Sequence, residues 1–410
     1  MLKPAQSSLP APFRYLAWSN LAAQCAEQIG LAASPIFAVL ALGAGAGETG
    51  ILQMAQTLPF LLFAIPIGLL ADRVHRSRLM AATEALRTAS LLCIVLLAAT
   101  GLITLPLLAL LGFVGACGTV AYSVTAPATV PGLVNGSDLP RANARIELAR
   151  TSAYAAGPAL GGLLVGHLGA VQAFSWAAAL SLAAVLLLSR VGEPARSTAP
   201  RRRAWLELKE GAAFVLGHPL LLPVFVTQLI FNTAFFMLYS AYVPHAMARL
   251  HLSAQGVGET LSAYGAGMII GALCATRVMR RLNFGTVIAT GPVAGLAGGA
   301  LMALTIWLPY PALAAAAFLL LGAGPILWVI STTTLRQTIT PPQLLGRVSA
   351  INILAYGARP IGASLGALIG GEWGAQACLL AAVVAFAMQA AVILISPVSR
   401  LAERPATVAA

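Results

Sequence analysis

Long apolar segments without charged side chains dominate the chain. Lys, Arg, Asp and Glu are absent from residues 88–137, 151–189, 211–248 and 282–335. A membrane-spanning helix needs about 20 apolar residues, so the longer segments must each hold two helices, separated by Gly and Pro at the turns. The pattern predicts twelve spanning helices: 14–42, 50–71, 79–100, 103–127, 141–166, 169–189, 220–244, 256–279, 284–307, 311–335, 344–371 and 375–396.

The composition excludes a water-soluble protein. Of 410 residues, 59% are hydrophobic and 9% are charged, whereas an ordinary globular chain carries about 25% charged residues. The apolar runs lack the alternation expected of barrel strands. We therefore predict an all-α integral membrane protein that lies in a lipid bilayer.

The positions of the basic residues predict the orientation of the chain. Between the predicted spans, the Lys and Arg clusters recur on one side, around residues 73–78, 190–209, 277–281 and 336–347. Because cytoplasmic connections carry the excess of Lys and Arg, both termini are expected in the cytoplasm. The net charge of +12 is then a topological signal, and no nucleic-acid partner is expected.

An internal repeat suggests two related halves. Leu139–Ala144 resembles Leu345–Ala350 at an offset close to half the chain length, and both segments continue into glycine-rich helices. We predict pseudo-symmetric six-helix bundles at 1–190 and 219–410, joined by a basic cytoplasmic linker, 191–218, with a possible amphipathic helix. Two repeats with a binding site between them are typical of secondary transporters.

Candidate chemistry for other functions is scarce. The five cysteines and five histidines are scattered, so no metal site is predicted. No Gly-x-x-x-x-Gly-Lys-Ser/Thr loop indicates an ATP-driven pump. A membrane-embedded enzyme would need a nucleophile and base or metal ligands at suitable spacing, and none is apparent. The prediction is a protein that is not an enzyme and has no cofactor.

The segment Gly68–Arg78 resembles the loop signature of the major facilitator superfamily, Gly-x-x-x-Asp-Arg-x-Gly-Arg-Arg. The matching positions are Gly68, Asp72, Arg73 and Arg76, while His75 replaces the second glycine. The resemblance implies the twelve-helix major facilitator fold, an inner-membrane location, and a conformational latch at these residues. The alternative is a solvated loop whose charges only set the topology.

A second segment resembles the antiporter motif in the fifth helix of drug exporters of this superfamily. Its residues are Gly157, Pro158, Gly161 and Gly162. The alternative is close helix packing through small residues. Residues 126–144 and 346–362 are in addition similar to the enterobactin-exporter and macrolide-efflux relatives, which implies export.

Polar residues inside the predicted spans are candidates for a substrate cavity, because such residues are costly in a bilayer and commonly functional. Glu27 shares one face of the first span with Asn20, Gln24 and Gln28. Stripes on the fifth, seventh and eleventh spans supply the other candidates: Glu147, Arg150, Tyr154, Gln228, Asn232, Tyr239, Asn352, Tyr356 and Arg359. Tyr122, Tyr242, Tyr264 and Trp328 could stack a planar ligand or serve only in packing.

Glu27 is the candidate for proton coupling, because a carboxylate in a low dielectric binds a proton more readily than one in water. Alternatively, Glu27 is permanently paired with Arg150 or Arg359. These arginines could instead attract an anionic or catecholate-like substrate. Glu84 and Arg87, three residues apart, are expected to pair near the cytoplasmic end of their helix.

The sequence thus predicts a secondary active transporter, monomeric, that exports a small organic molecule by alternating access. The exported molecule would be a drug-like compound or a siderophore, and proton antiport would drive its export. A nutrient importer or symporter on the same fold is the alternative, because helices alone do not reveal the direction of transport.

Overall fold

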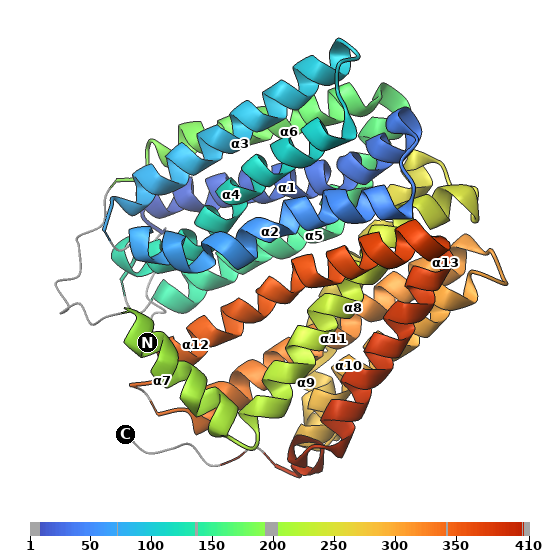
Figure 1. The fold of residues 1–410 in the computed structure, drawn as a ribbon. Coiled ribbons are helices and arrows are strands. Elements are labelled where there is room, and N and C mark those ends of the chain that lie inside the picture. Colours follow the sequence, from blue (N-terminus) through green and yellow to red (C-terminus); the bar gives the residue numbers. More distant parts are fainter. Residues whose placement is uncertain are drawn as a thin grey trace, which may run out of the picture.

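The computed structural model describes residues 9–71, 73–135, 138–192, 204–341, 343–403 and 405, and within these residues the secondary structure is helical, without strands (Figure 1). The α-helices are α1 (Ala11–Leu42), α2 (Ala46–Ala71), α3 (Arg76–Ala99), α4 (Leu105–Thr129), α5 (Leu139–Leu168), α6 (Ala170–Leu188), α7 (Ala204–Gly217), α8 (Leu221–Ala248), α9 (Ala254–Arg281), α10 (Phe284–Leu304), α11 (Pro311–Ile339), α12 (Leu345–Leu354) and α13 (Ala358–Ile395). Short 3-10 turns are η1 (Val130–Gly132), η3 (Ala355–Gly357) and η4 (Pro397–Arg400).

The predicted spans all lie on helices of the structure. Among the described residues, ten helices are long and apolar enough to cross a membrane. α5 is not one of them; its first half carries four charged residues. The spans 344–371 and 375–396 share one candidate, residues 355–395, which Gly374 interrupts with a φ of 80°. The all-α membrane fold is confirmed, while the number of twelve and the orientation of the termini stay predictions.

The helices pack as two groups that follow the order of the chain. In the first, α1 contacts α5 and α6, and α3 contacts α4 and α6. In the second, α8 contacts α13, and α11 contacts α9 and α10. Figure 1 shows the first group above the second, with α2 beside α13. Two of the three apolar clusters each draw on one group alone, whereas the largest draws on both.

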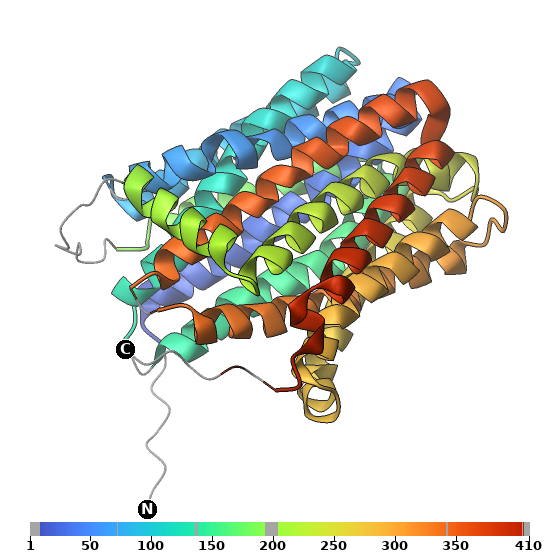
Figure 2. The same cartoon turned by 60° about the horizontal axis from the view of Figure 1, so that its bottom comes forward.

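The predicted linker contains α7, which packs against α12 and α8 at the end of the molecule where α1 begins (Figure 2). Gly211 of α7 lies against the backbone of Arg347, and Arg347 forms an ion pair with Glu210. Residues 193–203 of this linker lie outside the described residues. The two repeated segments both stand at the start of a helix, α5 and α12. The domain boundaries themselves stay a prediction.

Candidate functional site: a cavity between the two helix groups

A cavity of about 450 Å³ lies between the two groups of helices. Its walls come from α1 to α6 on one side and from α8, α9, α11, η3 and α13 on the other. Each wall therefore belongs to one half of the chain, and a movement of one half against the other would reshape the cavity. The volume falls within the range of about 300–1,000 Å³ that is common for small-molecule sites.

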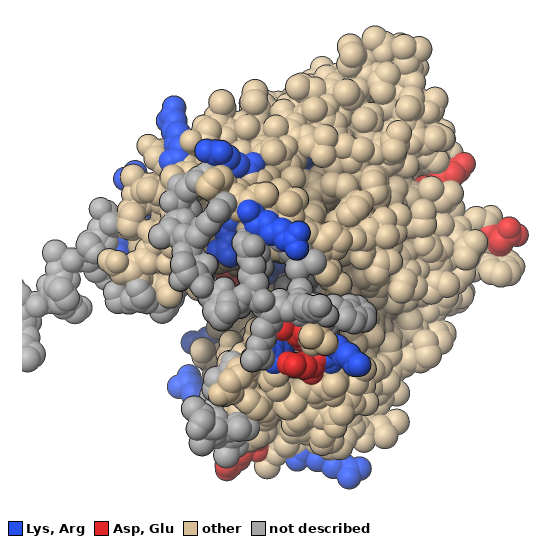
Figure 3. Space-filling model, turned by 60° about the vertical axis from the view of Figure 1, so that its left-hand side comes forward, with Lys and Arg blue, Asp and Glu red and all other residues tan. Residues whose placement is uncertain are grey.

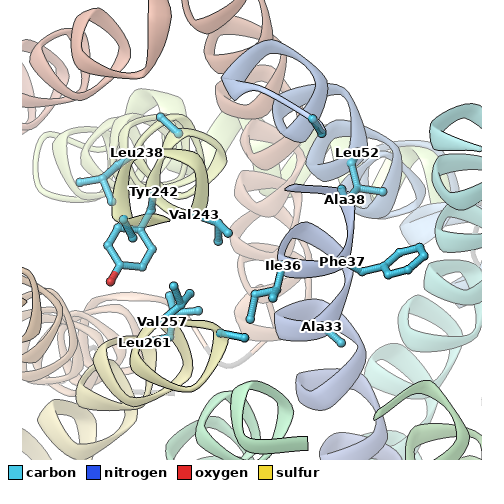
Figure 4. Close-up of a cluster of buried hydrophobic side chains, with 14 of the residues drawn as sticks. Ala33, Ile36, Phe37, Ala38, Leu52, Leu238, Tyr242, Val243, Val257 and Leu261 are labelled. Carbon is cyan, nitrogen blue, oxygen red and sulfur yellow. The ribbon is translucent and has the colours of Figure 1, made fainter. Parts of the chain in front are cut away.

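The cavity is sealed at one end by close contacts between the halves. Thr49 at the start of α2 donates a hydrogen bond of 2.7 Å to the carbonyl of Ser240 on α8. Apolar side chains of α1, α8 and α9 fill the same region, with Ile36, Val243 and Val257 facing one another (Figure 4). Toward the opposite end, which carries α7, the two layers of helices diverge (Figure 1).

The wall on the first half carries a carboxylate beside an arginine. Among the described lining residues, Glu27 of α1 is the one acidic side chain, and it is 15% exposed. Its Oε2 lies 4.0 Å from Nη1 of Arg87 on α3, whose side chain is 6% exposed. Arg87 in turn forms a 2.6 Å ion pair with Glu84, which is fully buried.

The wall on the second half is aromatic and holds a different arginine. The guanidinium of Arg359 lies 4.3 Å from the ring centre of Tyr356 and 5.3 Å from that of Phe236. It also lies 5.2 Å from the ring centre of Phe60 on α2, which belongs to the first half. Its Nε donates a 3.2 Å hydrogen bond to Oδ1 of Asn232. No carboxylate among the described residues forms an ion pair with Arg359.

Most of the predicted cavity residues do line the cavity. Those that line it are Gln24, Glu27, Gln28, Arg150, Tyr154, Gln228, Asn232, Tyr239, Tyr356 and Arg359, together with Pro158 of the antiporter-like motif and the aromatic candidates Tyr264 and Trp328. Their roles in transport stay predictions.

Three predicted cavity residues lie outside it. Asn20 is buried in the contact of α1 with α5, where its amide donates a 3.2 Å hydrogen bond to the carbonyl of Ile146. Glu147 is exposed and pairs with Arg150, and Asn352 offers its carbonyl to Gln228. Each shares a helical face with a true lining residue, but lies one or two turns nearer the α7 end.

The structure also corrects the partner of Glu27 and the position of the Glu84–Arg87 pair. Glu27 is nearest to Arg87, rather than to Arg150 or Arg359. Glu84 and Arg87 do pair, as their spacing predicted, but they lie in the middle of α3, beside the cavity, and not at the end of the helix.

Further polar groups in the cavity were missed by the sequence reasoning. Gln53, Gln56 and Thr57 of α2 line it, as do Ser90 and Thr119. Among the described residues, three buried polar atoms of the lining have no hydrogen-bond partner, and these are Nε2 of Gln28, Oε1 of Gln56 and Nε1 of Trp328. The signal was present in the sequence, since glutamines in an apolar helix are rare. The charged residue of α2, Glu48, however, lies in its first turn, outside the predicted span 50–71, whereas Glu27 lies within the predicted span of α1.

The predicted latch is described only in part, because Asp72 lies outside the described residues. Gly68 faces Val124 of α4, and Arg73 is exposed. Arg76 begins α3 and donates a 2.5 Å hydrogen bond from Nη1 to the carbonyl of Ala128. The loop is thus tied to the end of α4, and its role as a latch stays a prediction.

The glycines of the antiporter-like motif face two different helices. Gly157 and Gly161 lie against Gln28 and Ile29 of α1. Gly162 lies against Gly258 of α9, so close that a Cβ at position 162 would be 2.6 Å from the Gly258 Cα. Small residues here permit close helix packing, and Gly162 does so across the boundary between the halves.

Comparisons with known proteins identify the family. Residues 16–362 match the model of the Major Facilitator Superfamily. The chain is 27% identical over 395 residues to the multidrug efflux pump Tap of Mycobacterium tuberculosis (strain ATCC 25618 / H37Rv), covering 92% of this chain and 91% of that protein. A Tap protein of Mycolicibacterium fortuitum is 26% identical over 383 residues, covering 90% and 92% respectively.

Solved structures share the fold. The nucleoside transporter NupG, as its D323A mutant, superposes with a TM-score of 0.73 at 14% identity, covering 93% of this chain and 99% of its own. A bacterial homologue of the iron transporter ferroportin, in an inward-facing state, gives 0.70 at 15% identity, covering 94% and 100%. The protein is a multi-pass inner-membrane transporter and not an enzyme. The match over most of its length shows that the chain belongs to the major facilitator superfamily.

Proposed function

We propose that this transporter exports a small organic molecule with aromatic surface, in exchange for protons that enter the cell. The observation that carries the proposal is the position of Glu27, the one acidic side chain among the described residues of the cavity lining. A carboxylate held in a low dielectric beside a cation can exist in both protonation states. It can therefore bind a proton from one side of the membrane and release it to the other.

The distribution of charge supports export as the direction. Lys and Arg side chains gather on the end of the molecule that carries α7 (Figure 3), and an excess of such residues is typical of the cytoplasmic side. We place the opening of the cavity at this end, opposite the contacts between the halves that seal the other end, so that the substrate enters from the cytoplasm. The multidrug efflux pumps among the relatives of this chain favour the same direction.

The composition of the cavity supports an aromatic substrate. Phe235 is stacked with Tyr239 and lies 5.2 Å, ring centre to ring centre, from Tyr264. The exposed edges of this cluster and the Arg359 guanidinium offer flat surfaces against which a planar molecule can stack. Polar atoms of Gln56 and Trp328 that have no hydrogen-bond partner within the described part of the chain can bond to its polar groups. Drug-like compounds and siderophores with aromatic rings fit this description.

Alternating access then follows from the two-sided construction of the cavity. We place the two halves at 1–190 and 219–410 of a protein that acts as a monomer. During transport the halves separate at the sealed end and close at the α7 end. A proton from outside binds Glu27 and the substrate leaves, and the proton is released once the cavity again faces the cytoplasm. No covalent step is needed.

The test is transport in everted membrane vesicles, in which the cytoplasmic face is outside. Planar aromatic dyes such as ethidium are offered to energised vesicles, and an exporter accumulates at least one of them inside. Glu27→Gln should abolish the accumulation at unchanged protein level, while Glu259→Gln, an exposed acid outside the cavity, should retain it. Proton-driven loss of dye from these vesicles would instead show import.

A further inference from the structure

A second carboxylate stands behind Glu27 and shares its arginine. Arg87 donates to Oε1 of Glu84 from both Nε, at 3.2 Å, and Nη2, at 2.6 Å. Its Nη1 points instead toward Glu27, at 4.0 Å from Oε2. Glu27 lines the cavity, whereas Glu84 does not and is fully buried. One arginine thus bridges a carboxylate that can contact water and substrate and one that cannot.

The rest of this network holds Arg87 in place without changing its charge. Nη2 also donates to the carbonyl of Ala23 at 2.9 Å, and Nη1 donates to the hydroxyl of Thr119 at 3.1 Å. Ser181 of α6 donates to the same Oε1 of Glu84, at 2.7 Å. Oε2 of Glu84 has no hydrogen-bond partner among the described residues. The guanidinium is therefore held between two carboxylates by neutral groups.

The other charged groups that face Glu27 are already engaged or stand farther away. Arg150 of α5 is paired with Glu147, and Arg359 of α13 lies among three aromatic rings. Tyr154 of α5 is a further titratable group that lines the same cavity as Glu27, and Glu84 lies behind Arg87. Among the described residues, Arg87 is the cation nearest to Glu27, with Nη1 at 4.0 Å from Oε2. How tightly Arg87 is held by Glu84 therefore decides how much positive charge Glu27 experiences.

We propose that Glu84 is a positioning residue for proton coupling, which holds Arg87 away from Glu27 when Glu27 is protonated and releases it toward Glu27 when the proton leaves. A shift of about an ångström would bring Nη1 from 4.0 Å into hydrogen-bond distance of Glu27. The inference rests on the proposed function, because it treats Glu27 as the proton carrier. It adds a residue that touches neither substrate nor the cavity.

The test is an infrared titration of the purified protein in lipid. Protonated carboxyl groups give a separate C=O band, and the part that disappears in Glu27→Gln belongs to Glu27. In Glu84→Gln, Arg87 is free to pair with Glu27, so the midpoint of that band should move to lower pH by about one unit, a tenfold change. In the double variant Glu84→Gln/Arg87→Gln, Glu27 loses its cation, and the midpoint should move to higher pH than in the unmodified protein.

Ser181→Ala leaves the charges of Glu84 and Arg87 in place. It is the variant to measure if Glu84→Gln or Arg87→Gln prevents folding. Without the Ser181 hydroxyl, Glu84 depends more on Arg87, so the Glu27 midpoint should rise slightly. Glu259→Gln should leave it unchanged. Midpoints that do not move in folded variants would overturn the role of Glu84, even if transport still requires Glu27. A Glu27 band that is absent at every pH would overturn the proposed function together with it.

Discussion

Replacement of Gly162 by alanine tests whether the contact between α5 and α9 holds the closed end of the cavity. The added Cβ would lie 2.6 Å from the Cα of Gly258 and 2.7 Å from the carbonyl oxygen of Ala254. Both atoms belong to the backbone of α9, so no side chain can rotate away. Because ordinary contact begins at 3.4 Å, the two helices must separate by 3.4 − 2.6 = 0.8 Å at this point.

The expected magnitude follows from the cost of overpacking, which is about 1–3 kcal/mol. This cost falls only on the conformation in which α5 and α9 touch, because Gly162 loses its close neighbour once the halves separate at this end. The equilibrium between the conformation that is closed at this end and the one that is open at this end should therefore shift by about 5-fold to 150-fold toward the open one. Gly161→Ala adds a Cβ toward Ile29 of α1, within one half, and should affect stability more than this equilibrium.

The assay is a spin-label distance measurement across the closed end. Labels at Leu168 and His251, both exposed, are introduced after the five native cysteines are replaced. Gly162→Ala should add a longer-distance population, whereas Gly217→Ala, with nothing within 4 Å of its added Cβ, should not. A distance distribution identical in Gly162→Ala and the unmodified protein would refute the idea that this contact seals the cavity.

Three further predictions concern other parts of the molecule. Arg359→Gln removes the cation that lies among the rings of Tyr356, Phe60 and Phe236. It should weaken equilibrium binding of a stacked aromatic dye by about 1–2 kcal/mol. Unchanged affinity in a fluorescence titration would argue against stacking on this arginine. Asp72→Asn should slow transport at unchanged dye affinity if the loop is a latch, and a matched loss of affinity would indicate a binding role instead. Glu210→Gln breaks a partly exposed ion pair with Arg347 and should change the free energy of unfolding by no more than about 1 kcal/mol, as measured by thermal denaturation in detergent.

The fold was largely predictable because the bilayer imposes one strong rule on the sequence. Helices must be about 20 residues long and nearly free of charge, so interruptions of the apolar runs mark their ends. Gly101 and Gly374 lie between predicted spans and Gly169 is the first residue of one, and all three adopt positive φ. The family resemblance rested on short motifs whose spacing is fixed by a loop or a helix face, and it is confirmed.

The site was predictable only within single helices. Glu27, Gln24 and Gln28 were found because they share one turn-to-turn face of α1. The contact of Glu27 with Arg87 was missed because 60 residues separate them, and periodicity says nothing about which helices become neighbours. Asn20 was wrongly placed in the cavity for a related reason. The face of α1 that lines the cavity at Gln24 packs against α5 one turn earlier, at Asn20. Phe60 and Phe236 gave no signal, since aromatic residues in apolar spans are most often packing residues.

Proton movement in proteoliposomes tests the central claim, that Glu27 couples protons to transport. The purified protein is reconstituted with a pH-sensitive dye inside, and a gradient of a transported aromatic dye is applied from one side. The unmodified protein should move protons against the dye flux, and Glu27→Gln should move none, while still exchanging labelled for unlabelled dye across the membrane. Proton movement of undiminished rate in Glu27→Gln would contradict the account.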